Sequence, residues 1–402
     1  MPASCFTLSR RNFLKLTGSA SLALWLRPGL AAPGATGVSP RRLVFVEMNG
    51  GCDGLNTVIP YADGLYYDQR PTLAIAEQSV LALNNQIGFH PALARLHSLF
   101  NSGQVAVVQG VGHSVPDLSH FAMMDYWRSG HPDGALATGQ TGWLGRLLDQ
   151  LDTSDRLSGL SLSNGLGPVL ASQSAIVATL TDIDPPYVPE PFQDLFWSLL
   201  TGLAAENAAD ATLLSTAKKG MRHSRMALDL LPGLAAGSVV YADDETAQLF
   251  DWAARILSAS ADVRVIHIPL PLDFDTHSDQ AVTLGENFAL LDSALGTFLD
   301  DLSQRNLAEN TLVVLVSEFG RRVDENNSGG TDHGTASNAF IIGKRVVGGL
   351  YGQQPALSDL DDDGNLKMSL SYLDLLATVS QGWMDVSAGS ILPAGQVLKL
   401  FG

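Results

Sequence analysis

Five short apolar runs, rich in β-branched side chains and bounded by Gly, Asn or Asp, recur along the chain. Runs of this kind are typical of strands that are buried on both faces of a sheet. They predict strands at residues 43–48, 104–111, 263–268, 311–316 and 338–342.

Apolar residues at helical spacing lie between several of these runs. The spacing is clearest at 244–258 and 285–305, and weaker patterns predict helices at 92–101, 192–205, 210–231 and 371–382. Strands that alternate with helices favour an α/β fold, with a largely parallel or mixed sheet covered on both faces.

The middle of the chain, residues 150–245, has the weakest pattern. It could form a cap or an insertion, but no Pro/Gly/Ser-rich linker marks a boundary on either side. We find no internal repeat and therefore expect one domain over residues 42–402.

The first thirty-odd residues have the order of an export signal. Arg10-Arg11 is followed by a short apolar stretch and then by small residues up to Ala32. The arginine pair followed by Phe13 and Leu14 resembles a twin-arginine signal. We predict a signal peptide at 1–32, a flexible lead at 33–41, passage through the twin-arginine translocase, and a periplasmic or secreted product. The alternative is an amphipathic helix of a cytosolic protein.

Charge and cysteine content narrow the function. The chain has 24 Lys and Arg against 41 Asp and Glu, a net charge of −17. This argues against binding to nucleic acid or to anionic membranes, which need basic surface. No later segment is apolar enough for stable membrane insertion. Cys52 is the only cysteine beyond the signal, so we expect no internal disulfide and a buried Cys52.

Polar, potentially reactive residues follow three of the predicted strands, where sites in open α/β sheets usually lie. Asp53 follows the first strand in a Gly-rich turn, and its alternative role is that of an ordinary turn residue. Asp275 and His277 follow the third strand and offer oxygen and nitrogen ligands that suit Zn²⁺ or Mn²⁺. Asp273 lies one helical turn from His277. The alternative is a polar loop that caps the next helix.

Glu318 closes the fourth strand, and Asp332-His333 follows after a Gly-rich loop. Arg321 or Arg322 could hold an anionic substrate oxygen with a forked guanidinium, or simply pair with local carboxylates. Taken together, the strand ends supply the donor set of a two-metal site. Its candidate ligands are Asp53, Asp275, His277, Glu318, Asp332 and His333.

Ser119 precedes an apolar helical pattern. It could be a nucleophile activated by a nearby metal, or an ordinary helix cap. His120 could equally be a core histidine or one that supports a ligand. Residues 359–364 open like a calcium-binding loop, but the twelfth position is Leu370 where Glu is needed. We therefore interpret 359–364 as an acidic turn.

These motifs resemble those of the bacterial DUF1501 proteins, which usually carry twin-arginine signals. The resemblance begins near residue 42 and continues to the C-terminus with the motifs in order. The motifs that carry it are Asn49-Gly50-Gly51-Cys52-Asp53-Gly54-Leu55-Asn56, Ser119-His120-Phe121, Thr141-Gly142-Trp143-Leu144-Gly145-Arg146, Asp275-Thr276-His277, Ser317-Glu318-Phe319-Gly320-Arg321 and Asp332-His333-Gly334.

That family is similar to the alkaline phosphatase and sulfatase superfamily, and the similarity implies a three-layer α/β/α sandwich with a metal centre. It implies metal binding by Asp53, by Asp275 with His277, by the acidic Glu318 and by a last His, which is His333. It also implies that Ser119 is the nucleophile. The superfamily usually has Asp-His where this chain has Glu318-Phe319, so one imidazole is missing from the expected set.

The sequence therefore predicts an exported hydrolase of a phosphate or sulfate ester, acting on a small-molecule or polymer substrate. It would use one or two divalent ions, with Zn, Mn, Mg and Ca all open. The alternative is a non-catalytic exported envelope protein that retains the hydrolase fold.

Overall fold

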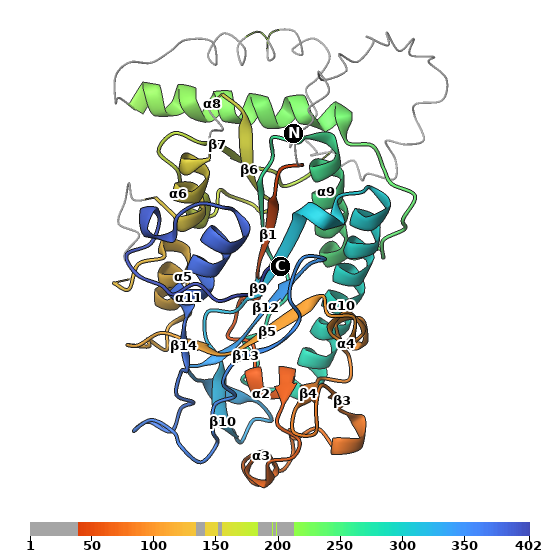
Figure 1. Ribbon diagram of the computed structural model, residues 1–402, viewed down its shortest axis with the longest axis vertical. Coiled ribbons are helices and arrows are strands. Elements are labelled where there is room, and N and C mark those ends of the chain that lie inside the picture. Colours follow the sequence, from red (N-terminus) through yellow and green to blue (C-terminus); the bar gives the residue numbers. More distant parts are fainter. Residues whose placement is uncertain (1–38, 134–140, 152–154, 184–194, 196–197, 199–212) are drawn as a thin grey trace, which may run out of the picture. The chain divides into compact units, whose positions relative to one another are not determined.

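The computed structural model describes residues 39–133, 141–151, 155–183, 195, 198 and 213–402, and the part from Ser39 to Gly402 forms one unit (Figure 1). The predicted signal peptide and residues 33–38 of the predicted lead lie outside the described residues. Of the predicted helix at 192–205, only Leu195 and Ser198 are described.

A nine-stranded mixed sheet forms the centre of the fold, in the order β13-β5-β12-β9-β1-β8-β6-β7, with β14 beside β5. Strand β12 runs antiparallel to its neighbours β5 and β9, and the other pairs are parallel. The strands are β1 Arg42–Glu47, β5 Val105–Gly112, β6 Leu157–Ser161, β7 Ile176–Thr179, β8 Val265–Pro269, β9 Thr311–Val316, β12 Ser337–Ile342, β13 Gly349–Gly352 and β14 Leu370–Ser371.

Strand β1 lies near the middle of the sheet, and its burial explains the run of apolar residues in its sequence. All six of its residues are buried. Val44 and Val46 join one hydrophobic core, whereas Leu43 and Phe45 join a second core on the opposite face. A strand that is covered on both faces needs apolar side chains at successive positions.

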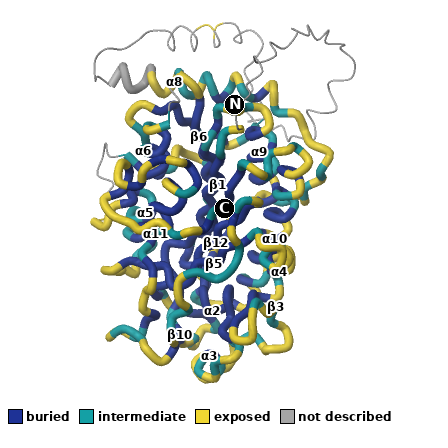
Figure 2. The backbone as a smooth tube through the Cα atoms, in the orientation of Figure 1, coloured by how far each residue is buried: buried dark blue, intermediate teal, exposed yellow. Residues whose placement is uncertain are grey.

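Helices cover both faces of the sheet, which confirms the predicted three-layer α/β/α sandwich. Figure 1 shows α4, α9 and α10 on one side of β1 and α5, α6 and α11 on the other. Figure 2 shows the buried strands between these exposed outer layers. The long helices are α4 Ala94–Asn101, α5 His120–Ser129, α6 Trp143–Gln150, α8 Leu213–Leu230, α9 Glu245–Ala259 and α10 Gln280–Gln304. The helix α11 Tyr372–Ala377 continues as a π-helical segment, Thr378–Trp383.

Smaller elements extend the carboxyl ends of the strands. Strands β2, β4 and β3 form a three-stranded sheet, and β10 pairs with β11 as an antiparallel hairpin. They are α2 Gly54–Thr57, β2 Val58–Ile59, α3 Gly64–Gln69, β3 Leu81–Ala82, β4 Gly88–Phe89, β10 Arg321–Glu325 and β11 Thr331–His333. The 3₁₀ turns are Glu77–Ser79, Pro168–Leu170, Leu231–Gly233, Ala308–Asn310 and Ala388–Ser390.

Two strands of the large sheet, β6 and β7, lie inside the segment 150–245 that could have been a cap or insertion. Strand β6 pairs with β8, and β7 pairs with β6 at the edge, so this part of the segment is integral to the sheet. The sequence of β6, LSGLS, is not an apolar run. The strand is nevertheless buried, because Ser158 and Ser161 form hydrogen bonds. Ser158 Oγ donates to the carbonyl of Ile176 at 3.2 Å.

Cys52 is buried and free, as expected, and burial raises the pKa of its thiol to about 12. The thiol is therefore protonated at neutral pH and unreactive. No helix in the described part of the chain combines the length and apolar character needed to cross a bilayer.

A buried polar network fastens α5 to the sheet. Glu47, at the end of β1, accepts from Arg128 of α5, with Arg128 Nη2 at 2.7 Å and Nε at 3.2 Å. His267 of β8 lies with Nε2 3.3 Å from Glu47 and Nδ1 2.9 Å from Ser161 Oγ. Burial alone would raise the pKa of Glu47, but His267 and Arg128 together lower it to about 2. Glu47 is therefore ionised and holds α5 at its C-terminal end.

This network predicts how stability depends on pH. Glu47 has a lower pKa in the folded than in the unfolded state, so its contribution is present above pH 4.5 and is lost as the pH falls through 2. Glu47→Gln should lower the free energy of unfolding at pH 7 by about 3 kcal/mol. Urea unfolding between pH 7 and pH 3 measures the effect, with the exposed Glu309→Gln as control. An E47Q variant with wild-type stability at pH 7 would contradict the assignment.

Candidate metal centre

Loops that follow β1, β8 and β9 meet at the carboxyl edge of the sheet, where α5 and the β10–β11 hairpin also arrive. Gly50 makes the closest approach, with φ of +113°, and a Cβ there would lie 2.3 Å from the backbone nitrogen of Asp275. Only glycine tolerates both that backbone conformation and that distance. The glycine pair after β1 is therefore required to bring the β1 and β8 loops together.

Three side chains from separate elements converge at this edge. His120, Asp275 and His333 each present a ligand atom, and these atoms lie within 4.8 Å of one another. His333 Nε2 is 3.2 Å from Asp275 Oδ1, and His120 Nε2 is 3.5 Å from Asp275 Oδ2. His277 lies beside them, with Nε2 2.9 Å from His333 Nε2 and 3.1 Å from Asp275 Oδ1. Among the residues that the structure describes, His120, Asp275 and His333 form the one such group.

The far nitrogen of each imidazole faces a hydrogen-bond acceptor. The partner of His120 Nδ1 is Glu318 Oε1 at 2.7 Å, and that of His333 Nδ1 is the carbonyl of Leu118 at 2.7 Å. His277 Nδ1 lies 3.1 Å from Asp332 Oδ1. These acceptors favour the tautomer of each neutral ring that carries its proton on Nδ1, in which the Nε2 lone pair is directed at the cluster.

The cluster thus gathers electron pairs that repel one another unless a cation lies among them. His120 Nε2 is buried and makes no hydrogen bond with any described residue. Imidazole nitrogens oriented from behind by a carboxylate or carbonyl, with an adjacent carboxylate, are the usual ligand set of Zn²⁺ and related ions. The residues present therefore fit a divalent cation.

Glu318, predicted as a ligand, lies behind His120. It is buried, and Oε1 accepts from the backbone nitrogen of Gly50 at 2.8 Å as well as facing His120. Oε2 accepts from Ser317 Oγ at 3.0 Å. The hydrogen bond to Glu318 raises the pKa of His120. In this arrangement Glu318 orients an imidazole and does not present an oxygen to the cluster.

Arg321, predicted to hold a substrate oxygen, is instead enclosed by protein. Its side chain is 0% exposed and forms an ion pair with Asp275 Oδ1. Burial alone would raise the pKa of Asp275, but the hydrogen bond and charge of Arg321, together with His333 and His120, lower it below its usual value. The other donors of Arg321 go to the carbonyls of Gly50, Gly51, Phe274 and Thr331. Arg321 therefore joins three loops and positions Asp275, and its enclosed guanidinium is not accessible to a substrate.

Asp53 is not part of the cluster. Its carboxylate is completely buried and pairs with the equally buried Arg70, with Arg70 Nη1 2.6 Å from Asp53 Oδ2. Oδ1 accepts from the backbone nitrogen of Leu55 at the start of α2, and Oδ2 accepts from Gln280 Nε2. Among the described residues, the partners of Asp53 give its carboxylate a structural role. The donor set for a second ion, which the sequence predicted, is therefore not assembled around Asp53.

Ser119 occupies the N-cap position of α5, but its hydroxyl makes no capping hydrogen bond. The carbonyl of Leu118 bonds His333, and His120 belongs to the cluster, so both neighbours of Ser119 are tied to the candidate centre. The Ser119 hydroxyl is therefore not engaged in capping α5.

His120 is the residue that sequence reasoning did not assign to the ligand set. Ser-His before an apolar helix also fits an ordinary cap, so the pattern alone left its role open. The ring of His120 lies 4.9 Å from the ring of Phe319, so an imidazole from another element lies beside the position at which the resemblance implies one. The one signal that the sequence offered was the missing histidine after Glu318, because a complete ligand set would then need a histidine from another element.

A cavity of about 560 Å³ opens beside the cluster. Its wall follows one face of α5 from His120 to Arg128 and includes Asn49, whose buried Oδ1 has no hydrogen-bond partner in the described part of the chain. Phe121, which is 87% exposed, lies on the same wall. The cavity offers room for a substrate next to the candidate ligands.

The acidic segment 359–364 forms a turn, in agreement with its interpretation from sequence. Asp361 Oδ1 accepts from the backbone nitrogens of Asp363 and Asn365 at 3.0 and 2.7 Å. These are the local hydrogen bonds of an Asx turn.

The fold and this cluster define an α/β protein with a candidate metal centre at the carboxyl edge of its sheet. The family model described as "Protein of unknown function (DUF1501)" matches residues 40–382, and the chain belongs to this family. No curated protein matches the sequence.

Several solved structures are similar to this chain at low sequence identity. Wild-type alkaline phosphatase PafA is 9% identical, with 91% of this chain and 100% of that chain covered and a TM-score of 0.48. The phosphonate monoester hydrolase SpPMH from Silicibacter pomeroyi is 11% identical, with 90% and 76% covered and a TM-score of 0.43. A protein of the alkaline phosphatase superfamily from Vibrio parahaemolyticus is 9% identical, with 87% and 70% covered and a TM-score of 0.39. These likenesses concern the fold and not the reaction.

The environment of Asp53 predicts a structural role that can be separated from metal binding. Asp53→Asn leaves Arg70 buried without its counter-ion, which should lower the free energy of unfolding by about 3–5 kcal/mol. Metal content per folded molecule should stay unchanged. Denaturant unfolding and elemental analysis measure the two quantities, with the exposed Asp324→Asn as control. Loss of metal with unchanged stability would show that Asp53 is a ligand.

Proposed function

We propose that the protein is an exported, metal-dependent hydrolase of a phosphate or sulfate ester. The observation that carries the proposal is the convergence of His120, Asp275 and His333 at the start of α5, directly after Ser119, whose hydroxyl makes no capping hydrogen bond. Nε2 lone pairs and a carboxylate facing one another need a cation, and a metal next to a free hydroxyl is a common arrangement for ester hydrolysis.

His120, His333 and Asp275 would hold the ion, with His277 adjacent and Asp332 orienting His277. A bound divalent ion supplies Lewis-acid stabilisation of the charge on the ester oxygens and lowers the pKa of a nearby hydroxyl. Glu318 keeps the His120 ring in place, and Arg321 keeps Asp275 in place.

In the reaction, Ser119 Oγ would form a bond to phosphorus or sulfur as the bond to the leaving alcohol oxygen breaks. The alcohol leaves with the proton that Ser119 loses. Water then attacks the ester of Ser119, which releases phosphate or sulfate and restores the serine hydroxyl. Each step is a displacement that conserves charge and needs no redox partner.

Arg128 takes the place that the sequence gave to Arg321. It lines the cavity, and Nε and Nη2 are fixed by Glu47. The hydrogen bonds of Arg128 with described residues come from Nε and Nη2, so that Nη1 would be free to donate to an anionic oxygen. The bidentate contact with Glu47 holds the guanidinium ready for this role.

A non-catalytic envelope protein with the same fold is the second candidate. It is favoured by one observation: Asp53 is committed to Arg70, so the described residues supply a single cluster where a two-metal enzyme needs two. In this case the ion would serve stability alone.

Ser119→Ala separates the two candidates. Turnover of aryl phosphates or aryl sulfates should fall at least about 1,000-fold, because the nucleophile is lost, while metal content and melting temperature stay at wild-type values. Ser114→Ala, an exposed serine in the same segment, is the matched control and should keep full activity. Wild-type protein that is metal-free and inactive after reconstitution with Zn²⁺, Mn²⁺, Mg²⁺ or Ca²⁺ would overturn the proposal.

A further inference from the structure

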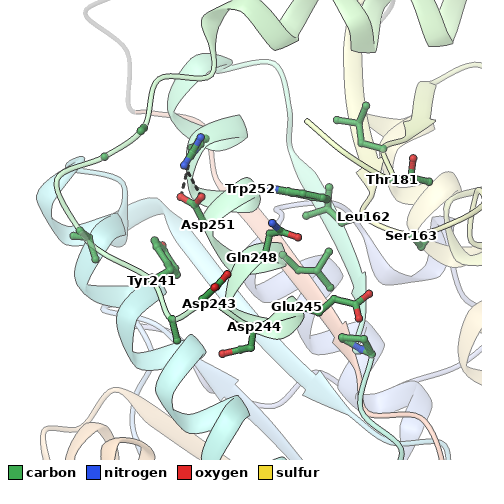
Figure 3. A pocket seen from close by; sticks show the side chains of 18 of the residues that line it. Leu162, Ser163, Thr181, Tyr241, Asp243, Asp244, Glu245, Gln248, Asp251 and Trp252 are labelled. Carbon is green, nitrogen blue, oxygen red and sulfur yellow. Dashed lines mark hydrogen bonds and ion pairs between the residues drawn. The ribbon is translucent and has the colours of Figure 1, made fainter. Parts of the chain in front are cut away.

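A second cavity lies at the same edge of the sheet, next to the candidate metal centre. It measures about 890 Å³ and is bounded by the ends of β6, β7 and β8 and by the start of α9 (Figure 3). Pro271, in the loop that follows β8, lines both this cavity and the one beside His120. The two cavities therefore adjoin across the loop that carries Asp275. We call the larger one the lateral cavity.

The lateral cavity is strongly acidic. Its lining holds four carboxylates and one cationic side chain, Arg255, which is bound to Asp251 at 2.6 Å. This leaves three carboxylates without an opposite charge in the lining: Asp243, Asp244 and Glu245. An anionic ligand would be repelled here, and the net charge of −17 on the whole chain acts in the same direction.

Helix stability explains only part of this charge. Asp244 caps α9, since its Oδ1 accepts from the backbone nitrogen of Ala247 at 2.8 Å, and Glu245 lies in the favourable first turn. Asp243 lies outside the helix and forms no hydrogen bond or ion pair with a described residue. Its carboxylate is free to contact a ligand.

Aromatic and polar groups complete the wall. Trp252 is only 8% exposed and lines the cavity, and its indole N–H, which makes no hydrogen bond with a described residue, can donate to an acceptor there. Tyr241 is held by a hydrogen bond from its hydroxyl to Asp301 at 3.1 Å. Figure 3 shows Tyr241 and Asp243 on one side of the cavity and Ser163 and Thr181 on the other. Carboxylates with aromatic faces suit an ammonium group, and the hydroxyls and the indole suit alcohol groups.

We propose that the lateral cavity binds the ammonium-bearing alcohol part of the substrate, an amino alcohol or an amino sugar, whose ester bond reaches the candidate metal centre past Pro271. The link to the reaction rests on the proposed function, whereas the binding of the ammonium group does not. The charge of the cavity excludes a polyanionic chain from the same position.

Binding of glucosamine, compared with the neutral and nearly isosteric glucose, tests the proposal on the full chain. Calorimetric titration at pH 6 keeps the amine protonated. Glucosamine should bind at least about tenfold more tightly than glucose, and the preference should weaken in 0.5 M salt, which screens exposed charges. The Asp243→Asn/Glu245→Gln double variant should lose about three- to tenfold in glucosamine affinity. The exposed Asp362→Asn variant is the control and should bind as wild type does.

Equal affinity for glucosamine and glucose would overturn the proposal, and so would a double variant that binds glucosamine as tightly as wild type. The comparison of the two sugars needs no variant, so a folding defect cannot obscure it. Ser119→Ala should bind glucosamine normally. A failure of hydrolysis and a failure of ammonium binding are therefore observed in separate experiments.

Discussion

The structure depends on one electrostatic constraint: the imidazole and carboxylate lone pairs of His120, His333 and Asp275 face a common point. The acceptors behind the two rings, Glu318 and the carbonyl of Leu118, prevent those rings from turning their N–H groups inward without losing a hydrogen bond. Such an arrangement is repulsive by itself and becomes favourable around a cation. Binding of a cation, as proposed above, would therefore be coupled to the folding of the surrounding loops.

Buried polar contacts bring these groups together from distant parts of the chain. Arg321 binds the carbonyls of the loop after β1 and the carboxylate of Asp275, so one guanidinium fixes two loops. At the other end of α5, Arg128 is held by Glu47. Because α5 begins at His120, this contact also limits how far that histidine can move. Each contact would be costly to break, since the partner left behind would be a buried unpaired charge.

Much of the fold could be predicted from the sequence because buried strands must be apolar. All five predicted strands occur, and the helical patterns at 244–258 and 285–305 correspond to α9 and to most of α10. Strand β6 was missed because its buried serines satisfy their hydroxyls through neighbours that sequence spacing does not reveal. The residues of the candidate site fall into the same two groups, those that a local sequence pattern marks and those that it does not. Asp275 and His333 could be found at strand ends, where a local pattern marks them.

Residues whose role depends on a distant partner could not be predicted in this way. A carboxylate after a strand reads as a ligand, but Asp53 pairs with Arg70, seventeen positions further on in a segment without pattern. Arg321 reads as a substrate-binding residue, yet carbonyls from three loops enclose it. The sequence therefore indicates where the chemistry gathers, and tertiary contacts decide which side chains face it.

The most direct test of this account is an anomalous-scattering map from crystals of the protein purified without chelators. The account predicts one peak coordinated by His120 Nε2, His333 Nε2 and Asp275, at about 2.0–2.3 Å from each ligand atom. A peak at Asp53, or the same side-chain arrangement with no peak after soaking in Zn²⁺ and Mn²⁺, would contradict it.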